Sequence, residues 1–205
     1  MKNNLKEKID NKLNQTDFDI LQSFFPEGRE LTLKKIMERS KYSYEPCYRT
    51  VNKLLKEKII SVKKFGRTLV YSLDFNKTQA KVAFYLYSTK RAYNFSVFQP
   101  SIFAALSEIP EDKAEFLAVF GSYAKETFTE KSDIDIICIS DDKEMEKKIK
   151  SLRYGYGKHF NPIITPKTEF AKIRDENKEF WNDLVNYGII FKGYELFYYY
   201  AYARK

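Results

Sequence analysis

The stretch FLAVFGSYAKETFTEKSDIDIICI, residues 116–139, decides the fold of the second half of this chain. It begins and ends with an apolar run of strand length, which predicts two buried strands. Residues two apart in a strand share a face, so Asp133 and Asp135 are expected to project together while the isoleucines beside them are buried. Two adjacent carboxylates repel each other, and a divalent cation between them relieves that repulsion.

A Gly-Ser pair separates the first apolar run from the aspartates. Gly121 permits a close approach of the backbone, and Ser122 offers a hydroxyl to a phosphate. Together with Asp133 and Asp135 as metal ligands, this pair predicts a site for a metal-bound nucleoside triphosphate. The alternative, in which the aspartates merely solvate one face of an edge strand, would make the spacing a coincidence.

The segment GSYAKETFTEKSDIDI resembles the signature of the DNA polymerase beta-like nucleotidyltransferases, and most closely that of the minimal nucleotidyltransferases. The matching positions are Gly121, Ser122, Ala124, Ser132, Asp133 and Asp135, and a weaker resemblance extends over residues 96–197. The resemblance implies that Gly121, Ser122 and Ser132 bind the nucleotide. It also implies Mg²⁺ with a nucleoside triphosphate, most simply ATP, and transfer of a nucleoside monophosphate with release of pyrophosphate. Minimal nucleotidyltransferases often act as antitoxins beside a partner toxin, so the resemblance implies a toxin or another protein as a candidate acceptor.

The chain departs from the family pattern at the third acid of the site. The resembled enzymes carry a carboxylate where this chain has Asn161, whose neutral amide can ligate a cation but cannot take a proton. Glu126 stands where many relatives have glycine, and Glu169 is a more remote acid. Either glutamate is a candidate for the missing carboxylate, although ordinary solvent-facing positions are the simpler expectation. His159, the one histidine, is expected to be structural.

The charge of the chain is unevenly distributed. Residues 1–95 hold 20 Lys and Arg against 10 Asp and Glu, whereas residues 96–205 hold 16 against 18. A basic first half joined to a nearly neutral second half predicts that the first half meets a polyanion. The plainer interpretation is a lysine-rich surface that only aids solubility.

The first half predicts three short helices followed by a basic hairpin. The phrase YRTVNKLLKEKIISVKKFGRTLVYSL resembles the recognition helix and wing of prokaryotic winged helix-turn-helix regulators. That resemblance implies contacts with double-stranded DNA. The residues expected to contact bases are Tyr44, Tyr48, Arg49 and Asn52. The residues expected to contact phosphates are Lys53, Lys56, Lys63, Lys64 and Arg67. Winged helices also serve as protein-binding or dimerising modules, so the pattern leaves both uses open.

We therefore expect an α+β chain of three parts. Residues 1–75 form a winged helix-turn-helix domain, 76–95 a connecting helix, and 96–205 a minimal nucleotidyltransferase-like domain with a small mixed sheet flanked by helices. The aromatic residues of the connecting helix either pack the two domains together or form the seam of a homodimer.

No stretch of the sequence approaches eighteen uninterrupted apolar residues, so we expect no membrane span. The polar start of the chain does not look like a secretory signal, and Cys47 and Cys138 lack metal-ligand spacing. These features predict a reduced, cytoplasmic protein.

Two functions remain open at this point. The first is a DNA-binding transcriptional regulator whose second domain binds Mg-nucleotide as a sensor, which Asn161 favours. The second is an active nucleotidyltransferase that modifies a protein, nucleic acid or small molecule, which the intact Gly-Ser pair and aspartates favour.

Overall fold

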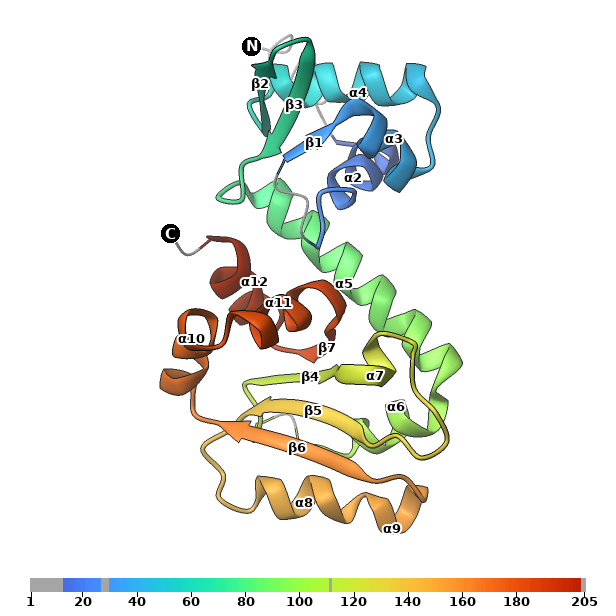
Figure 1. Cartoon of the computed structure of the whole chain (residues 1–205), viewed down its shortest axis with the longest axis vertical. Coiled ribbons are helices and arrows are strands. Elements are labelled where there is room, and N and C mark those ends of the chain that lie inside the picture. Colours follow the sequence, from blue (N-terminus) through green and yellow to red (C-terminus); the bar gives the residue numbers. More distant parts are fainter. Residues whose placement is uncertain (1–12, 27–29, 111, 204–205) are drawn as a thin grey trace, which may run out of the picture. The chain divides into compact units, whose positions relative to one another are not determined.

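The computed structural model describes residues 13–26, 30–110 and 112–203 (Figure 1). The chain divides into two compact units, residues 1–86 and 87–205, and each is described by itself. None of the helices in the described ranges is long and apolar enough to cross a membrane.

The first unit combines three helices with a three-stranded antiparallel sheet. Its elements are α2 (Gln15–Gln22), β1 (Glu30–Thr32), α3 (Leu33–Ser40), α4 (Tyr44–Lys56), β2 (Ile60–Phe65), β3 (Thr68–Leu73) and the start of α5 (Thr78–Phe98). The strands lie in the order β1-β3-β2. The three helices and the hairpin follow in the predicted order, whereas the short strand β1 was not predicted.

Local signals in the sequence explain where these elements begin and turn. Asn14 and Asp17 form a reciprocal capping box that starts α2, and the Thr32 hydroxyl accepts a hydrogen bond from the Lys35 amide at the start of α3. Gly66 joins β2 to β3 with φ +58°, a conformation that glycine adopts without strain.

Apolar side chains from α2, α3 and α4 form the core of the first unit. They include Ile20, Leu21, Phe24, Ile36, Val51 and Leu54, all nearly inaccessible to solvent. Phe24 lies in the turn after α2, and the other positions lie on the inner stripe of their helices. Burial of these side chains rather than helix propensity stabilises the unit.

The second unit is a four-stranded mixed sheet with helices on both faces. Its elements after α5 are α6 (Pro100–Ser107), β4 (Phe116–Phe120), α7 (Gly121–Ala124), β5 (Ile134–Ile139), α8 (Met145–Ser151), α9 (Arg153–Tyr156), β6 (Phe160–Thr165), α10 (Lys167–Glu176), α11 (Lys178–Tyr187), β7 (Ile189–Lys192), α12 (Tyr194–Tyr198) and a π-helical turn (Tyr199–Ala203). The strand order is β6-β5-β4-β7, with β4 antiparallel to both neighbours and β5 parallel to β6. This arrangement confirms the small mixed sheet flanked by helices.

The two faces of the sheet have different cores. On one face, alternate residues of β4 and β5 pack with α6, α8 and the second half of α5 in one apolar cluster. On the other face, Phe116 contacts Phe170 of α10 and Phe197 of α12 with ring centroids 5.2 and 5.5 Å apart. Figure 1 shows α8 and α9 on one side of the strands and α10 to α12 on the other. The tyrosine-rich end of the chain contributes to this second core.

Candidate functional site

The Gly-Ser turn lies directly after β4 and begins the short helix α7. Gly121 has φ +69°, and a Cβ atom at this position would lie 2.2 Å from Oδ2 of Asp135. Real Cβ atoms do not approach so closely, so the carboxylate occupies the space that only glycine leaves free. Gly121 is therefore required both by its backbone conformation and by its neighbour.

Strand register brings three chain segments together at this point. Phe120 pairs with Asp135 across the antiparallel β4–β5 ladder, and Asp135 pairs with Asn161 across the parallel β5–β6 ladder. The Asn161 amide donates a hydrogen bond from Nδ2 to Oδ1 of Asp135, 2.9 Å away. One oxygen of Asp135 thus faces Gly121 and the other faces Asn161.

Asp133 lies one residue before β5, and the strand alternation follows the prediction. Ile134 and Ile136 are fully buried, whereas Asp133 is exposed and Asp135 is half-buried. The backbone amide of Ile134 donates to the carbonyl of His159, which ties the start of β5 to the residue before β6. Both aspartates therefore emerge at the same end of the strand with solvent access.

The two serines proposed for nucleotide binding have different surroundings. Ser132 closes a turn before Asp133, because its hydroxyl accepts a hydrogen bond from the Thr129 amide at 2.8 Å. Ser122 is half-buried within α7, and its carbonyl accepts from the Thr127 amide. Ser132 thus shapes the loop that delivers Asp133, and its proposed contact with a nucleotide stays a prediction.

A charged contact ties α7 to α11. The ammonium of Lys125 lies 2.5 Å from Oδ2 of Asp183 and 5.4 Å from the ring centroid of Tyr187. The hydrogen bond with Asp183 raises the pKa of Lys125 above its ordinary value, so the lysine is a cation beside the Gly-Ser turn at neutral pH. No sequence pattern predicted this partner, because 58 residues separate the two side chains.

The remaining candidate acids do not complete the site. Glu169 lies on α10, beyond the far end of β6 from Asn161, and pairs with Lys172 at 2.7 Å. Glu126 has a left-handed backbone with φ 60° and is exposed. His159 is exposed next to Asn161. Both glutamates are thus exposed, as expected for ordinary solvent-facing residues.

The donor set suits a magnesium ion carried by a nucleotide rather than a closed protein cage. Across the described ranges, no group of three or more His, Cys, Asp and Glu side chains is placed to hold a metal ion. Mg²⁺ is commonly bound by one or two carboxylates, with substrate phosphates and water completing its octahedron. Asp133 and Asp135 would supply that pair, and Asn161 adds no negative charge.

The candidate DNA-contacting residues of the first unit differ in one respect from the prediction. Tyr44, Tyr48, Arg49, Asn52, Lys56, Lys63, Lys64 and Arg67 are all exposed. Lys53 is not equivalent, because its ammonium lies 2.6 Å from the buried carboxylate of Asp17. Removing a buried carboxylate's partner is costly, so we leave Lys53 out of the proposed DNA surface.

Comparison with known proteins decides the family of the second unit. The model of the nucleotidyltransferase domain family matches residues 102–198, from α6 to α12. A protein of Methanocaldococcus jannaschii with the provisional name protein adenylyltransferase is 34% identical over 91 residues, which span 41% of this chain and 85% of that relative. The chain belongs to the nucleotidyltransferase domain family. No solved structure matches the chain significantly.

The family match contains every residue of the candidate site. Gly121, Asp133, Asp135 and Asn161 all lie inside residues 102–198, as do the sheet and the helices on both of its faces. The helices and strands before α6 lie outside the matched range. Membership of the nucleotidyltransferases thus concerns the second unit, and the comparisons do not extend the resemblance to a winged helix.

Proposed function

We propose that the chain is a nucleotidyltransferase that moves a nucleoside monophosphate from a nucleoside triphosphate to a hydroxyl group of a protein. The observation that carries this proposal is the contact between Gly121 and Asp135, which brings a bare backbone turn against a carboxylate. The name of the Methanocaldococcus relative favours ATP as donor and a protein as acceptor. The family match supports an active nucleotidyltransferase over a nucleotide sensor.

The residues have separate roles in this proposal. The turn at Gly121 and Ser122 receives the triphosphate, because its backbone can approach the phosphates closely. Asp133 and Asp135 would hold Mg²⁺, which would supply positive charge to neutralise the charge that develops on the phosphoryl oxygens. The acceptor hydroxyl bonds to the α-phosphorus as the bond to the bridging oxygen breaks, and pyrophosphate leaves.

Asn161 orients the catalytic carboxylate rather than accepting a proton. Its amide donates to Oδ1 of Asp135 and so holds that carboxylate in a fixed position. Because an amide takes no proton at neutral pH, the proton of the acceptor leaves to water or to a group on the acceptor itself. A toxin encoded beside this chain is the acceptor that the family resemblance implies.

Transfer of label tests the enzymatic proposal. The full chain is incubated with MgCl₂, ATP labelled at the α or the γ phosphate, and the protein encoded by the neighbouring gene. We expect label from the α phosphate, but not from the γ phosphate, to be attached to the protein in a form that survives acid. Asp133→Asn or Asp135→Asn should reduce this transfer at least 100-fold. Asp141→Asn, an exposed carboxylate beyond the other end of β5, is the matched control.

The outcomes distinguish an active nucleotidyltransferase from a nucleotide sensor. Magnesium-dependent ATP binding without transfer to any acceptor would favour a nucleotide sensor. Transfer that survives both aspartate substitutions would contradict the site itself.

A second candidate function, DNA binding, rests on the exposed face of the first unit. Tyr44 and Tyr48 stack with centroids 5.5 Å apart although both are about half exposed, and Lys63 and Lys64 lie on the exposed strand β2. The order helix, strand, two helices and two strands is also that of a winged helix-turn-helix domain. These features support the proposal that α4 enters the major groove and the hairpin contacts the phosphates.

Salt dependence of binding tests this second function. We expect a duplex to bind the full chain with an affinity that falls steeply as salt rises, and Arg49→Ala or Arg67→Ala to weaken it. Arg174→Ala, in the second unit, removes the same charge far along the sequence and serves as the control. Affinity that does not change with salt, or absence of binding to any duplex, would reject DNA as the partner.

A further inference from the structure

The position of the Gly-Ser turn depends on a very short helix. α7 has four residues, and a single turn of helix is not stable without packing partners. The amide of Lys125 donates to the carbonyl of Gly121 at 3.0 Å, so the backbone of Lys125 is joined directly to the turn. Side chains on either side of α7 therefore hold the turn in place.

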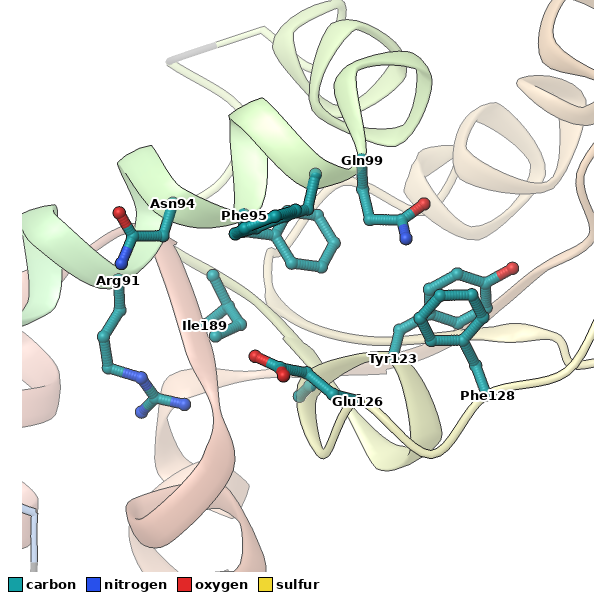
Figure 2. Close-up of a pocket in the computed structure, with 10 residues that line it drawn as sticks. Arg91, Asn94, Phe95, Gln99, Tyr123, Glu126, Phe128 and Ile189 are labelled. Carbon is teal, nitrogen blue, oxygen red and sulfur yellow. The ribbon is translucent and has the colours of Figure 1, made fainter.

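One side of α7 is held by an aromatic side chain. Tyr123 is buried and stacks in parallel on Phe128, with ring centroids 4.3 Å apart (Figure 2). Because an α-helix has 3.6 residues per turn, side chains two positions apart project in nearly opposite directions. Lys125 follows Tyr123 by two positions, so its side chain leaves α7 on the other side and meets a different element.

That other element is α11, which presents three side chains in a row. Phe180, Asp183 and Tyr187 are spaced three and four residues apart, and residues at these spacings share one face of a helix. The ring of Phe180 lies edge-on against Phe120, with centroids 5.0 Å apart. The ammonium of Lys125 lies 2.5 Å from Oδ2 of Asp183 and 5.4 Å from the ring centroid of Tyr187. One face of α11 thus contacts the residue before the turn and the residue after α7.

The helix α11 is itself fixed at both ends. Asn177 caps its start, where the side-chain oxygen accepts a hydrogen bond from the Phe180 amide at 3.1 Å. At its end, the guanidinium of Arg91 donates to the carbonyls of Tyr187 and Gly188, 2.6 and 3.2 Å away. The helix that contacts α7 is therefore anchored well enough to set its position.

We propose that Asp183 is a positioning residue of the nucleotidyltransferase site, which through Lys125 fixes the Gly121–Ser122 turn in the orientation that receives the triphosphate. This inference rests on the proposed function of the second unit. Because Gly121 packs directly against Oδ2 of Asp135, a shift of α7 also changes the turn's position relative to the carboxylates. Asp183 acts through Lys125 and lies outside the Gly-Ser signature, 50 positions after Asp133.

The size of the expected effect separates positioning from stability. The side chains of Lys125 and Asp183 are 34% and 41% exposed, and exposed ion pairs contribute little to the free energy of folding. In contrast, a displacement of reacting groups by about 1 Å can reduce a reaction rate by about 100-fold. Loss of Asp183 should therefore impair transfer without an appreciable loss of stability.

Alanine substitutions at the two ends of β4 test the proposal. Asp183→Ala removes the partner of Lys125 near the end of the strand. Glu115→Ala, the matched control, breaks a similar ion pair at its start, with Lys167 at 2.7 Å. The native chain and both variants are compared in nucleotide transfer with MgCl₂, ATP and the protein encoded by the neighbouring gene.

The kinetic parameters for the two substrates should respond differently. We expect Asp183→Ala to lower kcat/KM for ATP about tenfold and to leave the KM for the acceptor protein unchanged, because the turn receives the triphosphate. Glu115→Ala should match the native chain in both parameters. Thermal unfolding should show small and similar losses of stability in the two variants.

A second measurement needs no enzymatic activity. Amide chemical shifts of the nucleotide-free chain report on the turn itself, and Asp183→Ala should move those of Gly121, Ser122 and Asp135, whereas Glu115→Ala should not. Asp183→Glu, which keeps the charge, should restore most of the transfer rate and the native shifts. If the native chain transfers no nucleotide, the proposed transferase fails, and the amide shifts still decide whether Asp183 sets the turn.

Four results would contradict this role for Asp183. The first two are a native kcat/KM for ATP in Asp183→Ala and an equal loss of transfer in Glu115→Ala. The third is unchanged amide shifts at Gly121 and Ser122. The fourth is a loss of transfer that follows a loss of thermal stability, because the substitution would then act on folding.

Discussion

Gly121 and Asp135 are packed so closely that no side chain fits on residue 121. A Cβ atom there would lie 2.2 Å from Oδ2 of Asp135 and 3.1 Å from its carboxyl carbon. The glycine and the carboxylate are therefore one structural unit, although 14 positions separate them in the sequence. A side chain at residue 121 would force the carboxylate of Asp135 to move.

Substitution of Gly121 by alanine should abolish nucleotide transfer and destabilise the fold. The left-handed backbone alone costs about 1–2 kcal/mol, and displacement of Asp135 adds to that cost. Gly157→Ala is the matched control, because Gly157 has φ +63° with no atom within 4 Å of the added Cβ. Urea unfolding of both variants isolates the contact with Asp135. Equal losses of stability in the two variants would show that the contact contributes nothing.

Replacement of Asn161 by aspartate should make the site depend more strongly on magnesium. The change removes the hydrogen bond to Oδ1 of Asp135 and sets two carboxylates side by side, which lowers stability by about 1 kcal/mol without a divalent cation. Added MgCl₂ should restore that stability and raise the rate of transfer. Thermal unfolding with and without MgCl₂ measures the effect, with Asn161→Ala as the variant that removes the hydrogen bond but adds no charge. A magnesium response no larger than that of Asn161→Ala would contradict the prediction.

Substitution of Glu126 by glycine should stabilise the chain. Glycine relieves the left-handed strain, and a gain of about 1 kcal/mol is expected. Lys58→Gly, at another exposed left-handed residue with φ 56°, should give a similar gain. Calorimetric unfolding of both variants measures the two gains. Loss of stability in Glu126→Gly would indicate that the side chain supports the fold itself.

The thiol of Cys138 should make stability fall at alkaline pH. Burial in β5 raises its pKa from 9.0 to about 12, and the nearby Lys192 opposes this only in part. The unfolded chain loses this proton near pH 9 while the folded chain keeps it. The contribution of Cys138 is therefore complete below pH 9 and falls by about 1.4 kcal/mol per pH unit between pH 9 and 12.

Comparison with Cys138→Val isolates this effect from other groups that titrate at high pH. The difference in unfolding free energy between the native chain and the variant should be constant from pH 7 to 8.5 and shrink by pH 10. A constant difference up to pH 10 would mean that the thiol ionises in the folded state.

Much of the second unit could be predicted because its signals are local. The alternation around Asp133 and Asp135 depends on residues two apart, and the turn at Gly121 depends on one residue that lacks a Cβ. The family comparison confirms the nucleotidyltransferase identity of this unit. The first unit has the predicted helices and hairpin, whereas its function as a winged helix stays a proposal.

The structural role of two charged residues could not be predicted from the sequence. Lys53 was expected to meet a phosphate but pairs with buried Asp17, 36 residues earlier in the chain. Glu126 is exposed, as expected, but its left-handed backbone with φ 60° was not predicted. The pair of Lys53 with Asp17 depends on which helices pack together, and side-chain periodicity along one helix contains no information about its neighbour.

The sequence by itself determined the apolar runs, the glycine bend and the paired acids, because each follows from backbone sterics and alternation over a few residues. The tertiary structure alone decided that Asn161 donates to Asp135 and that Lys125 meets Asp183. These contacts join segments 26 to 58 positions apart, or on separate helices, and only strand register and helix packing bring them within reach.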